Sequence, residues 1–146
     1  MAAPLFIFGR KSMSTVALVE ESKATAEVAA IFADIRATFG MPFVPAMFRA
    51  IAHHPAYLKA SWERVKVVMG PGLIDRKTKE MIAVAVSAAN GCDYCVQAHT
   101  AALKGMGSQD AEIVELMAVV DLFSGFNKML SGLQVAPDVG TIRHST

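Results

Sequence analysis

Charged residues are scarce in this sequence. Only 18% of its 146 residues are charged, compared with about 25% in an average protein, whereas 53% are hydrophobic. The 14 basic and 13 acidic residues leave a formal net charge of +1, so no strong positive field is available for a nucleic acid. The composition excludes a disordered chain and a coiled coil, and it predicts a globular protein that does not bind nucleic acid.

Long hydrophobic runs are also missing. The longest segments without a charged residue, such as Met81–Cys92, contain 12 residues, whereas a membrane-spanning helix needs about 20. The apolar stretch Leu5–Phe8 is short, and Arg10 and Lys11 follow it, which is the reverse of the order in a signal peptide. We therefore expect a soluble cytoplasmic protein with no membrane partner.

The sequence has no strong strand pattern, and its apolar residues recur at helical spacing. Helices are expected over residues 21–39, 45–51, 55–69, 76–89 and 92–104, and from a Ser108 cap to about Gly132. We predict one all-α domain over residues 21–133, with an N-terminal segment (1–20) and a C-terminal tail (134–146). So many apolar residues leave helix faces unfilled within one subunit, which favours a homo-oligomer.

Cysteine is rare as well, because Cys92 and Cys95 are the only two. In a reducing compartment, such a pair is more typical of redox or metal chemistry than of a structural disulfide. His99 follows Cys95 by four residues, so the three side chains share one face of the expected helix. The helix N-terminus and the imidazole both favour a thiolate, and the pattern therefore indicates a redox-active pair.

Glu80 lies one expected helix earlier, on a row with the small or apolar residues Val84, Ser87 and Ala88. If it faces His99, its carboxylate accepts the ring proton and orients the imidazole beside a thiol nucleophile. The alternative is a surface ion pair with Arg76 at i,i+4 spacing.

The spacing Glu80-x11-Cys92-x2-Cys95-x3-His99 resembles the signature of the alkylhydroperoxidase AhpD branch of the carboxymuconolactone decarboxylase family. The resemblance runs from about residue 25 to residue 133. It includes Phe39-Gly40 with Pro45, Phe48-Arg49-Ala50, His53-His54-Pro55 and Asn90-Gly91-Cys92.

This resemblance implies an AhpD-like helical bundle that assembles into a dimer, trimer or hexamer. It also implies peroxide reduction by the cysteine pair, a proton relay from Glu80 through His99 to the thiols, and no cofactor or metal. Tyr94 stands where better-known members have a histidine before the second cysteine. The relay then rests on His99 alone, because tyrosine accepts no proton near neutral pH.

Two effects disagree on which thiol attacks. The helix dipole favours Cys92, whereas His99, one turn away, favours Cys95. An oriented base outweighs a screened dipole worth ~0.3–1 kcal/mol, so we expect Cys95 to attack and Cys92 to resolve the intermediate. The predicted function is a thiol-dependent peroxidase that reduces hydroperoxides, organic ones included, and is reset by a dithiol or protein reductant.

Other functions use the same residues. A thiol–disulfide adaptor that reduces another protein, such as a peroxiredoxin, needs the same pair. A non-enzymatic metal-binding oligomer is less favoured, since Cys-x2-Cys-x3-His offers three ligands and zinc takes four. His53 and the stretch from Phe39 to His54 are weaker candidates for a pocket wall.

Overall fold

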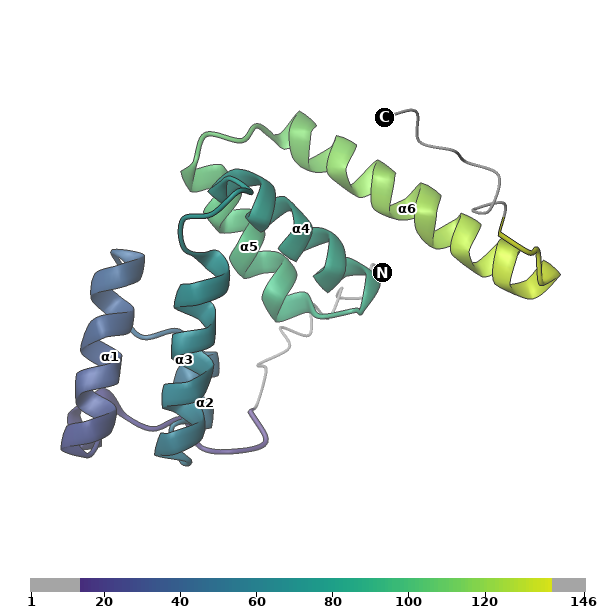
Figure 1. Cartoon of the computed structure of the whole chain (residues 1–146). Helices are drawn as coiled ribbons and strands as arrows, with labels where there is room; N and C mark the ends of the chain where they lie inside the picture. The colour runs from purple at the N-terminus through teal and green to yellow at the C-terminus, as the bar shows by residue number, and fades with distance from the viewer. Residues whose placement is uncertain (1–13, 138–146) are drawn as a thin grey trace, which may run out of the picture. The chain divides into compact units, whose positions relative to one another are not determined.

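The computed structural model describes residues 14–137. The Leu5–Phe8 stretch lies outside the described residues, as do parts of the predicted N-terminal segment and C-terminal tail. Every regular element within the described residues is helical, which confirms the all-α prediction (Figure 1). In that part of the chain, no helix has both the length and the apolar character needed to cross a membrane.

The described residues form two compact units, which comprise residues 14–70 and 71–137. The first contains a 3-10 helix, η1 (Glu21–Lys23), and the helices α1 (Ala26–Phe39), α2 (Ala46–Ile51) and α3 (Pro55–Met69). The second contains α4 (Arg76–Ala89), α5 (Asp93–Gly105) and α6 (Asp110–Leu133).

In the first unit, local signals begin and end the helices. The Thr25 side chain accepts a hydrogen bond from the Val28 N–H, so α1 begins at Ala26 rather than at the predicted residue 21. Gly40 ends α1 in the left-handed conformation, with φ +64°. The ring Nδ1 of His54 accepts from the Tyr57 N–H and caps α3, where Pro55 takes the first helical position.

The first unit buries an aromatic core. Phe48 lies edge-on to Trp62, with ring centroids 5.6 Å apart, and Phe39 lies edge-on to the same ring at 5.3 Å. The Trp62 indole N–H donates to Asp34 of α1 at 2.7 Å, so the buried ring keeps a polar partner. Around these rings pack Val28, Phe32, Ile35, Val44, Ala52 and Leu58.

The second unit starts with a helical hairpin. Asp75 caps α4 by accepting from the Thr78 N–H at 3.0 Å. After Asn90, the chain turns through Gly91 at φ +69°, and the Cys92 N–H donates back to the Ser87 carbonyl at 2.9 Å. This short turn places α5 directly alongside α4 (Figure 1).

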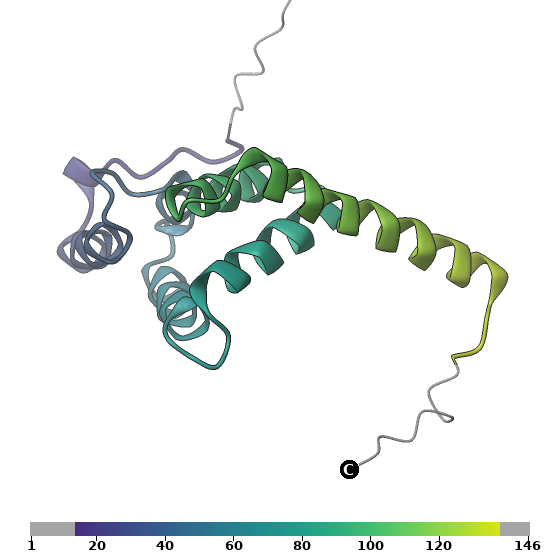
Figure 2. The same cartoon turned by 90° about the horizontal axis from the view of Figure 1, so that it is seen from above.

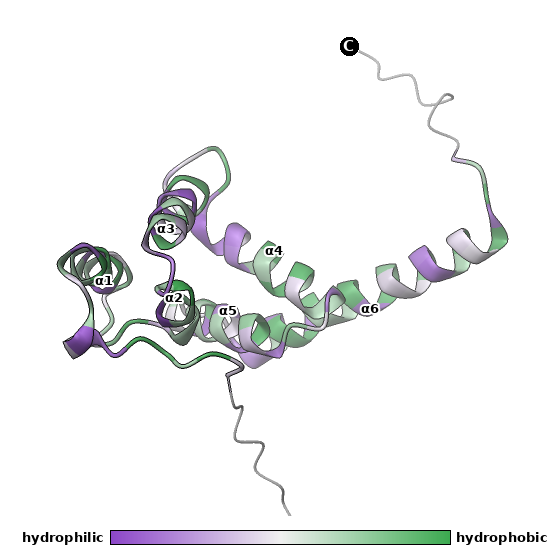
Figure 3. Ribbon diagram, turned by 90° about the horizontal axis from the view of Figure 1, so that it is seen from below, coloured by the Kyte–Doolittle hydropathy of each residue, from purple (hydrophilic) through white to green (hydrophobic). Residues whose placement is uncertain are grey.

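The last helix, α6, differs from the prediction at its start. Ser108 is buried and donates its backbone N–H to Leu103, so Gln109 takes the cap position and Glu112 accepts the Gln109 N–H at 3.1 Å. No residue of α6 is buried, and its C-terminal half extends beyond the α4–α5 hairpin (Figure 2). Several of its exposed turns are hydrophobic (Figure 3).

Candidate functional site

The α4–α5 hairpin carries all four predicted site residues. Glu80 lies on α4, one turn after its first residue, and Cys92, Cys95 and His99 occupy the cap and first two turns of α5. Glu80 and His99 contact each other, and the two cysteines contact each other. The turn between α4 and α5 thus brings together Glu80 and His99, which are 19 positions apart in the sequence.

The two cysteines are free thiols, and their sulfurs lie 2.7 Å apart. Both side chains are half-buried. Cys92 is the N-cap of α5, and its sulfur accepts the Cys95 backbone N–H at 3.4 Å. A disulfide S–S bond measures about 2.05 Å, so a small movement of the side chains is sufficient to form one.

The environment of Cys95 raises the pKa of its thiol and so favours the protonated form. Its hydrogen bond with Cys92 raises the pKa of the Cys95 thiol, and burial raises it further. A hydrogen bond with Ser87 of α4 acts in the opposite direction. Cys95 therefore depends on a neighbouring base to become a thiolate near neutral pH.

Glu80 is a buried carboxylate, with 1% of its side chain exposed. Its Oε2 lies 2.6 Å from Nδ1 of His99, and its Oε1 accepts from Nε of Arg76 at 2.8 Å. Burial by itself raises the pKa of Glu80, but the hydrogen bonds from His99 and Arg76 outweigh it and lower the pKa below the ordinary value. The two interpretations of Glu80 are therefore not exclusive, since it contacts both His99 and Arg76.

The contact with Glu80 determines which nitrogen of the neutral His99 ring carries the proton. An ionised carboxylate only accepts hydrogen bonds, so the Nδ1 that faces Glu80 carries the proton. The lone pair of the neutral ring then lies on Nε2. His99 is one-third exposed, and this second nitrogen can act as a base.

The weaker candidates lie in the first unit and have structural partners. Nε2 of His53 lies 2.7 Å from the Ala17 carbonyl, and His54 caps α3. Within the stretch from Phe39 to His54, the side chains of Phe39 and Phe48 pack in the aromatic core. Tyr94 is exposed on α5.

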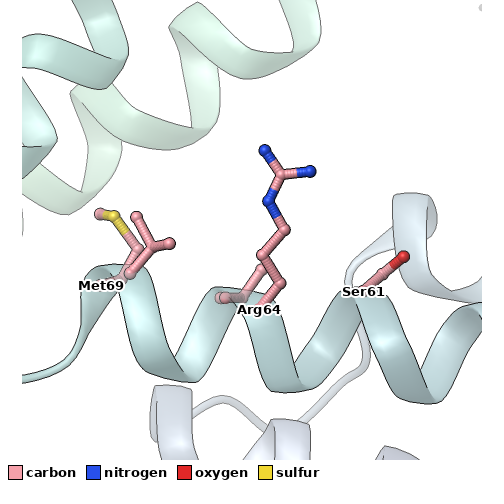
Figure 4. A pocket seen from close by; sticks show the side chains of 5 residues that line it. Ser61, Arg64 and Met69 are labelled. Carbon is pink, nitrogen blue, oxygen red and sulfur yellow. The ribbon is translucent and has the colours of Figure 1, made fainter.

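A hollow of about 270 Å³ lies along α3 in the first unit. Figure 4 shows side chains of this one helix around it. It is lined by Ser61, Arg64, Val65, Val68 and Met69, and it contains no thiol, carboxylate or imidazole. The hollow therefore lacks the groups of the thiol site.

Sequence reasoning gave Arg76 only a surface role and Ser87 none. The i,i+4 spacing in the sequence predicts that Arg76 pairs with Glu80. The sequence does not predict that Glu80 is buried. Among residues 14–137, no group of three or more His, Cys, Asp or Glu side chains is arranged to hold a metal ion.

Fold and site together define an AhpD-like helical protein with a cysteine pair at the start of a helix. The chain belongs to the carboxymuconolactone decarboxylase family, whose model matches residues 55–138. It is similar to the crystal structure of an alkylhydroperoxidase AhpD core from Rhodospirillum rubrum. The two are 41% identical, the TM-score is 0.83, and the match covers 90% of this chain and 99% of that one.

Two curated relatives are more distant. An (R)-2-haloacid dehalogenase from Pseudomonas putida is 28% identical over 72% of this chain, and an alkyl hydroperoxide reductase from Mycobacterium tuberculosis is 30% identical over 68%. The matches cover 35% and 28% of those two proteins, so this chain spans about a third of their length.

Proposed function

We propose that this chain is a thiol-dependent peroxidase that reduces hydroperoxides, including organic ones, through a dithiol–disulfide cycle of Cys92 and Cys95. The observation that carries this proposal is the pair of free sulfurs 2.7 Å apart, one helical turn before a His99 that is bonded to a buried carboxylate. The names of the relatives support the same class of reaction.

In the first step, His99 Nε2 takes the proton of Cys95, and the resulting thiolate attacks one oxygen of the hydroperoxide. An S–O bond forms as the O–O bond breaks. The proton held by His99 passes to the leaving alkoxide, which departs as an alcohol. Cys95 is oxidised to a sulfenic acid, and Glu80 stabilises the charge of the ring while it holds the proton.

In the second step, the Cys92 sulfur attacks the sulfenic sulfur. An S–S bond forms, the S–O bond breaks, and hydroxide leaves with the Cys92 proton as water. An external dithiol then reduces the Cys92–Cys95 disulfide by exchange and becomes a disulfide itself. Each cycle consumes one hydroperoxide and one dithiol.

The test counts thiols in the reduced protein before and after one equivalent of cumene hydroperoxide. We expect both thiols to be lost as one peroxide is consumed. In Cys92→Ser, a dimedone adduct should form on Cys95, whereas in Cys95→Ser the Cys92 thiol should stay free. An adduct on Cys92 with peroxide turnover retained in Cys95→Ser would reverse the order of the two cysteines.

The same assay separates the peroxidase from the adaptor. Thiols that remain free while the peroxide persists would contradict peroxidase activity. If the reduced chain instead reduces the disulfide of an oxidised peroxiredoxin, and its own Cys92–Cys95 disulfide is then reduced by a dithiol, its function is that of a thiol–disulfide adaptor.

A further inference from the structure

Arg76 forms the outer side of the Glu80 site. It is the first residue of α4, and its guanidinium is bonded to Oε1 of Glu80 through Nε at 2.8 Å and Nη2 at 2.6 Å. His99 occupies the other oxygen, Oε2, at 2.6 Å. The buried carboxylate thus lies between a permanent cation and a titratable ring.

An exposed ion pair at i,i+4 contributes only a few tenths of a kcal/mol to helix stability. The Arg76–Glu80 pair differs because 44% of the Arg76 side chain is exposed, compared with 1% of that of Glu80. A carboxylate removed from water in this way needs a compensating charge. Arg76 provides that charge from the surface of the helix.

The charges around Glu80 determine whether His99 can accept a proton. With Arg76 in place, Glu80 is neutralised without a proton, and His99 can remain uncharged with a free lone pair on Nε2. Without Arg76, the nearest compensating cation is an imidazolium at His99, which carries protons on both nitrogens and accepts none. Fewer of the rings would then be able to take a thiol proton near neutral pH.

We propose that Arg76 is a positioning residue for the thiol chemistry: by neutralising Glu80, it keeps His99 uncharged and able to accept a proton. This inference rests on the proposed function, in which His99 is the base. The lowered pKa of Glu80, to which the Arg76 hydrogen bond contributes, supports it.

The other charged groups on the packed helices have different partners. Lys77 of α4 is bonded to Glu112 of α6 at 2.6 Å, and Lys104 of α5 is bonded to Asp110 at 2.8 Å. Among the described ion pairs, those of Glu80 are with Arg76 from α4 and His99 from α5. Lys77→Met therefore removes a paired cation from the same helix without touching Glu80, and it serves as the matched control.

The experiment compares Arg76→Met, Arg76→Lys and Lys77→Met with the unaltered chain. The rate of thiol oxidation by cumene hydroperoxide is followed from pH 5 to 10 on fully reduced protein, and circular dichroism verifies the fold of each variant. In Arg76→Met, we expect the acid limb of the rate profile to move up by about one pH unit, so that the rate falls about tenfold at pH values well down that limb and less at pH 7. At high pH the rate should return to within about twofold of the original.

Arg76→Lys retains a cation and should restore most of the profile, and Lys77→Met should leave it unchanged. A uniform rate loss in Arg76→Met, with the same profile shape, would assign Arg76 a purely structural role and overturn the proposal. An unchanged rate at every pH would overturn it as well.

A second readout does not require peroxidase activity. The ring protons of His99 are followed by NMR as a function of pH in the unaltered chain and in Arg76→Met. We expect the titration midpoint of the ring to rise by about one pH unit in the variant. If the chain consumes no peroxide but the midpoint rises, the proposed function fails while the role of Arg76 stands. An unchanged midpoint overturns that role.

Discussion

The two units of this chain bury different kinds of residue. In the first, α1, α2 and α3 close around aromatic and aliphatic side chains, with Trp62 and Phe48 almost fully enclosed. In the second, α4 and α5 bury Val84 and Leu103 but also the carboxylate of Glu80, and α6 buries no residue. Apolar packing therefore organises the first unit, whereas a polar contact lies at the centre of the α4–α5 hairpin.

This difference indicates that the apolar residues that stabilise the fold and the polar residues of the candidate site lie in different parts of the chain. An aromatic core gains free energy from the area removed from water, and it needs no particular charge state. A buried carboxylate costs free energy unless it is bonded, so it is retained where its charge has a use. The unit with the smaller apolar core is the one that holds Cys92 and Cys95.

The largest expected effect on the unfolding free energy comes from a comparison of two phenylalanine substitutions, one in each unit. Phe48 is 3% exposed and Phe126 of α6 is 44% exposed. Phe48→Ala should lower the free energy of unfolding of the first unit by about 3–5 kcal/mol, because it leaves a cavity beside Trp62. Phe126→Ala should lower the unfolding free energy of an isolated chain by less than about 1 kcal/mol. Urea denaturation at low protein concentration measures both.

The Phe126 variant also tests the predicted homo-oligomer. If the exposed apolar face of α6 is covered by another copy of the chain, Phe126→Ala should weaken the association measured by sedimentation equilibrium. If Phe48→Ala and Phe126→Ala lowered the unfolding free energy of the monomer equally, the contrast between a packed first unit and an exposed α6 would be contradicted.

A smaller effect concerns the buried carboxylate and pH. The pKa of folded Glu80 lies below its ordinary value of 4.5, so the folded state favours the ionised form. The resulting stabilisation is complete above that value and is lost as the pH falls through the folded pKa. At pH 7, Glu80→Gln should therefore reduce the unfolding free energy by about 1.5–3 kcal/mol, through loss of charged hydrogen bonds.

This difference between the unaltered chain and Glu80→Gln should shrink as the pH falls below 4.5. Urea denaturation at a series of pH values measures it. A difference that stays constant down to pH 3 would show that the Glu80 charge does not stabilise the fold.

The smallest effect is at a helix cap of the first unit. Thr25→Ala removes the side-chain acceptor for the Val28 N–H and should cost about 1 kcal/mol of unfolding free energy. Thr25→Ser retains the hydroxyl and should cost less. A thermal melt that finds both variants equally destabilised would indicate that packing of the Thr25 methyl group, not the cap, is responsible.

Helix ends with strong local signals are predictable from this sequence. Pro55 and Gly70 delimit α3, and Asp75 and Asn90 delimit α4, as expected. The start of α6 is different, because the burial of Ser108 transfers the cap to Gln109, and burial is a tertiary property that local sequence does not contain.

The contact of Glu80 with His99 follows from the spacing of the motif, since one short turn folds α5 back on α4. The simultaneous bond of Glu80 to Arg76 does not follow, because spacing alone presents the two partners as alternatives. The stretch from Phe39 to His54 was a candidate pocket wall, and two of its side chains, Phe39 and Phe48, pack on Trp62. An apolar helical pattern is the same for a core and for a pocket wall.

The position of Cys92 at the cap of α5 has a thermodynamic consequence. A bond between Cys92 and Cys95 encloses only two intervening residues. A cross-link stabilises a fold mainly by restricting the unfolded chain, and the restriction grows with the length of the enclosed loop. The reduced and oxidised forms should therefore unfold at similar temperatures, and in the proposed cycle the disulfide would form and break while the helices around it remain folded.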